Sequence, residues 1–198
     1  MRGSGILLHI SSLPGPYGIG TIGKSAYQLI DFLAKAGQKY WQVLPLGPTS
    51  YGDSPYQTFS AFAGNPYFID LDTLVEEGYL EKRDLKSLAV VPDPHRVDFE
   101  RIYKTRFPVL EKAYDRFLKK DDFKEFKKFI EENRFWLEDY ALFMALKSVN
   151  VEGNWFGWTE LHRIRDKETI DRFKKEHSDK IEFWYFVQYK FFEQWLKL

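Results

Sequence analysis

The side chains best suited to chemistry or ligand binding lie in residues 47–66, a segment without helical or strand periodicity. Aromatic rings alternate there with hydroxyl and amide groups, at Tyr51, Ser54, Tyr56, Gln57, Phe59, Ser60 and Asn65. Flat apolar faces beside hydrogen-bonding groups suit a sugar ring, and ligand pockets combine such surfaces with a few placed polar groups. A loop that packs against itself has the same composition, so composition leaves both interpretations open.

Two carboxylates, Asp53 and Asp70, accompany this segment. Glycosidic chemistry needs two carboxyl groups that flank the bond, one as acid and one as nucleophile or base. Nothing in the sequence marks Asp53 and Asp70 as such a pair. Asp53 precedes Ser54 and Pro55, a context in which aspartate commonly bonds its own backbone in a turn, and direct contact with a substrate is the alternative.

A glycine motif raises a second class of function. Gly18, Gly20 and Gly23 match G-x-G-x-x-G between an apolar stretch and a helical one, the fingerprint of dinucleotide binding. The first glycine lies well beyond the end of the apolar stretch at Ile10, however, and residues 44–46 (LPL) stand where a ribose-binding acid is expected. We therefore favour glycines that permit tight turns and close approach to a sheet.

The remaining composition restricts cofactors and partners. His9 stands alone in an apolar stretch, which favours a hydrogen-bonded structural histidine, and no second histidine lies near enough in sequence for a metal pair. This spacing gives no sign of a metal site, and the family resemblance described below implies neither a metal nor a cofactor. The chain has no cysteine, which excludes disulfides and thiolate chemistry, and its 29 basic and 29 acidic residues cancel. That balance carries no signature of a nucleic-acid or membrane partner.

Localisation follows from two absences in the sequence. No stretch approaches the roughly 18 apolar residues of a membrane span. The apolar run near the N-terminus is too short for a signal peptide. We expect a cytoplasmic protein, with neither nucleic acid nor membrane as its partner.

A strand–helix–strand unit must position the groups described above. Residues 5–10 (GILLHI) and 40–46 (YWQVLPL) are apolar runs typical of strands buried on both faces of a parallel sheet. Residues 24–36 between them show helical spacing, and Gly37 is placed to end that helix. Because a helix joins the two strands, they should be parallel. The segment 47–66 then follows a strand.

The rest of the chain is predicted to be mostly helical, over residues 73–80, 102–119, 122–133, 135–149, 168–176 and 179–198. Two strands are too few for a parallel sheet that is covered on both faces. We expect the last helix to lead to a third strand outside this sequence, which makes the chain a fragment.

The motifs resemble one family over most of the chain. GILLHISSLPGPYGIGTIG (5–23) and KYWQVLPLGPTSYGDSPYQTFSAFAGNPYFIDL (39–71) look like the start of the amylomaltases. These disproportionating enzymes are 4-α-glucanotransferases of glycoside hydrolase family 77. RVDFERIY (96–103) and WLEDYALFMALK (136–147) are similar to the same family in the same order.

The resemblance implies an α/β fold: the first two strands of a (β/α)8 barrel with an inserted, mostly helical subdomain. Residues 1–46 would form the first strand–helix–strand, 47–178 the substrate-binding loop and inserted subdomain, and 179–198 the helix before a third strand. The implied enzyme transfers α-1,4-glucan segments between maltooligosaccharide, amylose or starch chains by retaining double displacement. Its catalytic carboxylates lie on later strands, so we expect no catalytic residue in this chain and no activity without the remainder of the enzyme.

The resemblance also implies binding residues, carried over by motif. Ser54 and Tyr56 match positions lining the subsite next to the cleaved bond, with Asp53 beside them among the substrate-binding residues. Tyr51 and Tyr103 match a second glucan site away from the reaction centre. These positions suit a barrel, whose active site lies at the carboxyl ends of the strands. A glucan-binding module without chemistry of its own is the alternative function.

Overall fold

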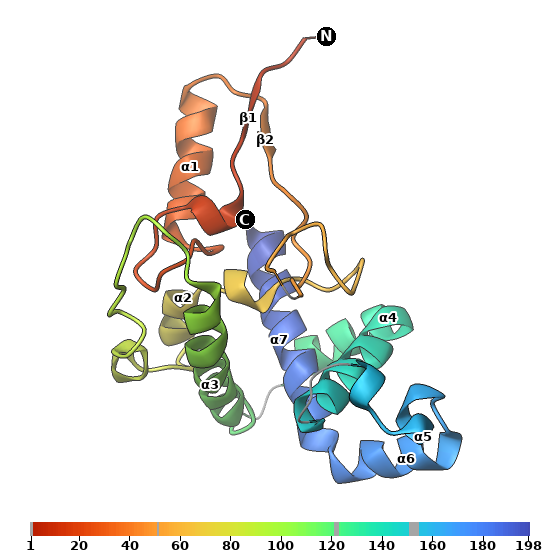
Figure 1. The fold of residues 1–198 in the computed structure, drawn as a ribbon. Helices are drawn as coiled ribbons and strands as arrows, with labels where there is room; N and C mark the ends of the chain where they lie inside the picture. The colour runs from red at the N-terminus through yellow and green to blue at the C-terminus, as the bar shows by residue number, and fades with distance from the viewer. Residues whose placement is uncertain (1, 51, 121–122, 151–154) are drawn as a thin grey trace. The chain divides into compact units, whose positions relative to one another are not determined.

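The computed structural model describes residues 2–50, 52–120, 123–150 and 155–198. They form short strands and a larger number of helices (Figure 1): β1 Gly5–Leu7, α1 Lys24–Lys35, β2 Tyr40–Gln42, α2 Leu71–Glu76, α3 Phe99–Phe117, α4 Lys124–Val149, α5 Glu160–Arg163, α6 Lys167–Glu176 and α7 Ser178–Lys197. Short 3-10 turns lie at Ile10–Ser12, Pro66–Phe68, Lys82–Leu85 and Trp155–Gly157.

The chain divides into two compact units. One comprises Met1–Asp121 together with Lys190–Leu198, and the other comprises Asp122–Tyr189. The domain limits implied by the family resemblance, after residues 46 and 178, concern a complete barrel and stay predictions.

The first unit begins with the predicted strand–helix–strand. β1 and β2 are parallel, with Gly5 opposite Tyr40, and α1 runs alongside them (Figure 1). The parallel pairing is therefore confirmed. Gly37 ends α1 as expected: its φ is +69°, and its amide donates to the Ala34 carbonyl at 3.1 Å. Glycine enters this left-handed region without the steric penalty of a Cβ atom.

The strands are shorter and more exposed than the apolar runs predicted. β2 stops at Gln42, ahead of Pro45, which has no amide hydrogen to donate to a sheet. β1 stops at Leu7, and the chain then turns into the 3-10 turn at Ile10–Ser12. Ile6 is 42% exposed and Leu7 57%. The prediction of strands buried on both faces is wrong for the described residues, because two strands and one helix cannot cover both faces of a sheet.

Aspartate caps explain why two helices begin earlier than predicted. The Asp70 carboxylate accepts from the Thr73 amide at 2.8 Å and starts α2 at Leu71. Asp98 accepts from the Arg101 amide at 3.0 Å and starts α3 at Phe99. A capping side chain satisfies one of the amides that a helix start leaves unpaired, so the helix extends back to it.

The last turns of α7 belong to the first unit and are fastened to Asp70. The Asp70 amide donates to Gln194 Oε1 at 2.6 Å, and Gln194 Nε2 donates to the Asp70 carbonyl at 3.1 Å. Phe191, on the same turns, is 2% exposed. Gly64 leaves room for that ring, since a Cβ atom there would lie 2.0 Å from Phe191 Cδ1.

The second unit corrects one predicted boundary. Residues 122–133 and 135–149 were expected to form separate helices, and α4 runs through both. Arg134, at the expected break, pairs with Glu131 at 2.9 Å and with Glu138 at 3.3 Å. Such pairs three and four residues apart stabilise a continuous helix. α6 and α7 lie within a residue of the ranges predicted for them. Within the described ranges, no helix combines the length and the apolar character needed to cross a bilayer.

Candidate functional site

The segment 47–66 is irregular, as predicted. Its described residues form neither a helix nor a strand, apart from a single antiparallel bridge between Thr49 and Thr58. The Asn65 amide donates to the Leu46 carbonyl at 2.8 Å. The segment thus leaves β2 and returns to the place where it started, as a loop with a closed base.

A tight turn lies at the tip of this loop. Gly52 and Asp53 both have positive φ, +90° and +54°, and the Asp53 amide donates to the Ser50 carbonyl at 3.0 Å. Asp53 therefore lies in a turn that its backbone amide closes, and the bond from its carboxylate to its own backbone stays a prediction. The Tyr56 amide donates to Ser54 Oγ at 3.4 Å, and the Tyr56 ring is 71% exposed. Asp53 thus ends one turn, and Ser54 and Tyr56 lie in the next, where the Gln57 amide donates to the Ser54 carbonyl at 3.0 Å.

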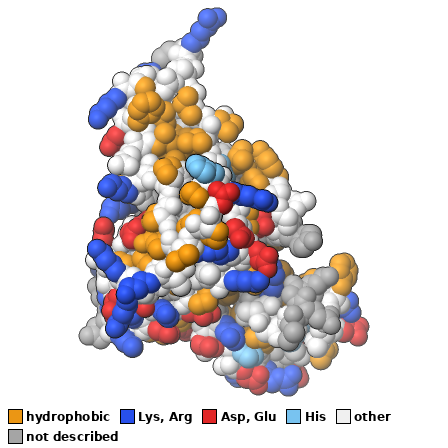
Figure 2. All heavy atoms as spheres, turned by 60° about the vertical axis from the view of Figure 1, so that its left-hand side comes forward, with side chains coloured by type: hydrophobic (Ala, Val, Ile, Leu, Met, Phe, Trp, Pro, Cys, Tyr) orange, Lys and Arg blue, Asp and Glu red, His pale blue; other side chains and the backbone are white. Residues whose placement is uncertain are grey.

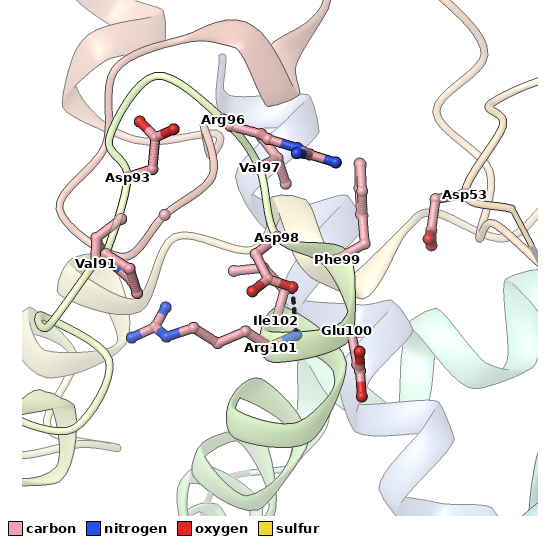
Figure 3. A pocket seen from close by; sticks show the side chains of 12 residues that line it. Asp53, Val91, Asp93, Arg96, Val97, Asp98, Phe99, Glu100, Arg101 and Ile102 are labelled. Carbon is pink, nitrogen blue, oxygen red and sulfur yellow. Dashed lines mark hydrogen bonds between the residues drawn. The ribbon is translucent and has the colours of Figure 1, made fainter.

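A pocket of about 540 Å³ lies between this loop and the start of α3. In Figure 3, Asp53 faces the side chains of Phe99 and neighbouring α3 residues from the opposite side. The walls come from four parts of the chain: Gly18, Asp53, residues 91–93 and residues 96–102. The volume is in the range of small-molecule sites, which span about 300–1,000 Å³.

A group of aromatic rings stands beside the pocket. Tyr67 is buried, with its ring centroid 6.3 Å from that of Phe99 and 6.2 Å from that of Phe107. Phe107 also contacts Tyr103, at 5.5 Å. Tyr103 is 61% exposed. The half-buried Phe107 thus packs against both the buried Tyr67 and the exposed Tyr103.

Asp53 and Tyr103 both raise the pKa of the buried Tyr67 side chain. Burial raises the pKa of Tyr67 to about 12, and the charges of Asp53 and Tyr103 add to the rise. Burial also raises the pKa of Asp53. These residues therefore share one region. Among the predicted site residues that the structure describes, Asp53 lines the pocket, whereas Ser54, Tyr56 and Tyr103 do not. Tyr51, predicted to form the second glucan site with Tyr103, lies outside the described residues.

The other carboxylates near the site have structural partners. Asp70 accepts from Thr21 Oγ1 at 2.6 Å in addition to capping α2. Asp93 accepts from the His95 amide, and Asp98 caps α3. The pocket combines the ring of Phe99 with charged side chains of both signs, and these carboxylates are not an acid–nucleophile pair. In the part of the chain that the structure describes, no three His, Asp or Glu side chains gather as a metal site.

Packing accounts for the glycine motif. A Cβ atom at Gly20 would lie 1.9 Å from the Ile10 carbonyl oxygen, and one at Gly23 would lie 2.1 Å from Asp70 Oδ2. Both glycines are required by contacts within the chain, as the structural interpretation predicted. These contacts remove the motif's support for a nucleotide site.

His9 is held by packing more than by hydrogen bonding. Its ring meets Phe68 edge to face at 5.2 Å, and its Nδ1 is buried without a hydrogen-bond partner among the described residues. The hydrogen bond predicted for this histidine is therefore not made at Nδ1. Burial lowers the pKa of His9.

Sequence patterns did not single out Arg96, Phe99 or Tyr67, which the structure places in or beside the pocket. Arg96 and Phe99 belong to the RVDFERIY motif that contains Tyr103. The aspartate at position 98 was a signal available there for a helix start, because aspartate is a preferred N-cap residue.

Comparison with known proteins assigns this arrangement to a family. The family described as 4-alpha-glucanotransferase matches residues 8–198. The chain belongs to the 4-alpha-glucanotransferase family. It is 52% identical, over 96% of its length, to the 4-alpha-glucanotransferase of Clostridium butyricum, and 50% identical over 100% of its length to that of Streptococcus pneumoniae.

A solved structure of the same family agrees. The amylomaltase from Streptococcus agalactiae in complex with acarbose matches with a TM-score of 0.94 and 42% identity, covering 100% of this chain and 40% of that one. The chain spans 39% of the length of the 4-alpha-glucanotransferases from Clostridium butyricum and Streptococcus pneumoniae.

Proposed function

We propose that this chain is the N-terminal part of a 4-α-glucanotransferase that moves α-1,4-glucan segments between maltooligosaccharide or amylose chains. The family match over residues 8–198 carries the proposal. In the retaining reaction, a carboxylate displaces the leaving sugar from C1 while an acid protonates the departing oxygen. The hydroxyl of an acceptor sugar then displaces the carboxylate and returns its proton to the same acid–base group. The carboxylates of these steps belong to sequence beyond Leu198.

The proposed architecture is a (β/α)8 barrel that begins with β1, α1 and β2. The parallel pairing of the strands supports it. So do the exposed apolar side chains of Ile6, Leu7, Phe32 and Tyr40, which are 42–67% exposed. Figure 2 shows hydrophobic side chains at the surface on one face of the molecule. The partner we propose for this surface is the remainder of the same enzyme.

The glucan-binding surfaces are assigned to the loop and to α3. Ser54 and Tyr56, with Asp53, bind the sugar beside the cleaved bond, and Tyr51 and Tyr103 form a second glucan site. The open rings of Tyr56 and Tyr103, 71% and 61% exposed, support these roles. The reaction takes place in the cytoplasm, on chains derived from starch, glycogen or maltose, without a cofactor.

Maltotriose provides the test of the activity. The full-length enzyme should convert it to glucose and longer maltooligosaccharides, whereas the 198-residue chain should form neither. Turnover by the chain would overturn the assignment of the catalytic carboxylates to later sequence. A full-length protein that binds maltoheptaose but never transfers glucose units would establish a glucan-binding module instead.

Tyrosine variants test the binding surfaces. Replacing Tyr56 or Tyr103 by alanine removes a ring, and ring interactions contribute about 0.5–1.5 kcal/mol, or roughly a 2- to 12-fold loss of affinity. Tyr27, on α1 and 38% exposed, is the matched control, because it belongs neither to the loop nor to α3. Isothermal titration with maltoheptaose makes the comparison. Equal affinities in Tyr103→Ala and Tyr27→Ala would count against the second glucan site.

A further inference from the structure

Arg106 is a buried cation without an assigned role. It lies on α3 one turn beyond Tyr103 and is 1% exposed. Its Nε donates to the Pro66 carbonyl at 3.4 Å, and its Nη2 donates to the Ile69 carbonyl. Its Nη1 is buried and has no acceptor among the described residues. The guanidinium is therefore committed to the backbone of one short segment.

That segment closes the loop of residues 47–66, which we call the glucan-binding loop. The carbonyls of Pro66 and Ile69 stand at the two ends of the 3-10 turn Pro66–Phe68. Asn65 caps the turn by accepting from the Tyr67 amide at 3.0 Å, and its own amide bonds the Leu46 carbonyl. One side chain on α3 thus holds both ends of the turn that anchors residues 47–66 after β2.

The positive charge of Arg106 strengthens its attachment to these two carbonyl groups. Burial lowers its pKa to about 10, while the charge of Asp70 opposes the fall, so the guanidinium stays charged at neutral pH. A buried charge depends strongly on the partners fixed around it. The planar guanidinium reaches two carbonyls at once, a geometry that the single ammonium group of lysine cannot reproduce.

We propose that Arg106 is a positioning residue for glucan binding: it fixes the exposed ring of Tyr103 in register with the loop that carries Ser54 and Tyr56. The inference rests on the binding roles proposed above for these residues. Arg106 itself does not touch the glucan. Its effect passes through the turn at Pro66–Phe68 and through Tyr67, whose ring packs against Phe99 and Phe107 of α3.

Arg116 offers a matched control on the same helix. It donates to the Tyr79 carbonyl at 3.2 Å and to Asp84 at 2.6 Å. It therefore also joins α3 to backbone and carboxylate groups, but to those of residues 79–84 and not to the glucan-binding loop. Loss of Arg116 reports the effect of weakening α3 packing alone.

The experiment compares Arg106→Met, Arg106→Lys and Arg116→Met in the full-length enzyme, with KM and kcat measured for maltoheptaose. Arg106→Met should raise KM about fivefold and change kcat less than about twofold, with Arg106→Lys intermediate. Arg116→Met should leave KM within about twofold of wild type. In a Tyr103→Ala background, Arg106→Met should add little, because residues that act through one contact are not additive. An unchanged KM, or an equal rise in Arg116→Met, would overturn the proposal.

Hydrogen exchange separates this proposal from the proposed activity. Arg106→Lys should speed amide exchange in residues 64–70 and leave residues 79–84 at the wild-type rate, whatever the enzyme does to glucan. Unchanged exchange in residues 64–70 would refute the positioning role even in an active transferase. A wild-type enzyme that transfers no glucan would refute the activity while the exchange data still decide the role of Arg106.

Discussion

Replacement of Asp70 by alanine should destabilise the first unit more than the loss of an ordinary helix cap. Asp70 caps α2 through the Thr73 amide and accepts from Thr21 Oγ1. Its negative charge also favours the buried Arg106 cation without a direct ion pair to it. Alanine removes both hydrogen-bonding roles and the charge.

The magnitude follows from these parts. Loss of a cap costs about 1 kcal/mol. Leaving the buried hydroxyl of Thr21 without its acceptor costs about 1–3 kcal/mol. The sum of about 2–4 kcal/mol compares with total stabilities of about 5–15 kcal/mol for whole proteins. In a chain of this size each kcal/mol lowers Tm by about 2–4 °C. We therefore expect a fall of about 4–16 °C.

Thermal unfolding followed by circular dichroism at neutral pH tests the prediction. Asp98→Ala is the control, because Asp98 caps α3 in the same way and its side chain is exposed. Its loss should lower Tm by only about 2–4 °C, from a cost of about 1 kcal/mol. Asp70→Asn keeps a capping oxygen and removes the charge, and its Tm should lie between those of wild type and Asp70→Ala. If Asp70→Ala fell no further than Asp98→Ala, the buried contacts of Asp70 would add nothing to its helix cap.

Two further predictions concern packing and titration. Gly64→Ala places a methyl group against the buried Phe191 ring and should lower the free energy of unfolding by about 1–3 kcal/mol. A chemical-denaturation midpoint equal to wild type would contradict this. Gly37→Ala is the steric control, because the open space around its Cβ leaves only backbone strain. His9→Phe keeps a ring against Phe68 and removes a group whose pKa burial lowers below 6.5. Because the unfolded chain then protonates first, wild-type stability is complete above pH 6.5 and falls as the pH drops below it. The Tm difference between about pH 7.5 and about pH 5.5 should therefore be smaller in His9→Phe.

Local patterns predicted several features because short-range physics decides them. Apolar runs joined by a periodic helix predicted the parallel pairing of β1 and β2, and Gly37 predicted the end of α1. The Gly, Pro and Asn content of residues 47–66 predicted an irregular loop, with Asp53 in a turn. The helix break predicted near residue 134 is wrong: α4 is continuous there, and Arg134 forms ion pairs with residues on both sides of the predicted break.

Longer-range features needed the tertiary structure. From its sequence position, Asp70 was a potential carboxylate of the site. Its partners, Thr21 and Gln194, lie 49 and 124 residues away along the chain, and they make it a structural residue. Arg106 had no local motif at all, because its acceptors are carbonyls of a distant turn. Side-chain partners at such separations depend on packing, which no short pattern records.

The sequence by itself determined the family, since a long run of loop residues from Trp41 to Leu71 is too specific to arise from periodicity alone. It also determined which rings and hydroxyls accompany one another on the loop, because they are neighbours in the chain. Only the tertiary structure decided that Asp53 and Tyr103 both raise the pKa of the buried Tyr67. It also decided that Arg106 links α3 to the end of the loop at Pro66. The physical reason is that burial and charge interaction depend on distance in space, which becomes defined only when the chain has packed.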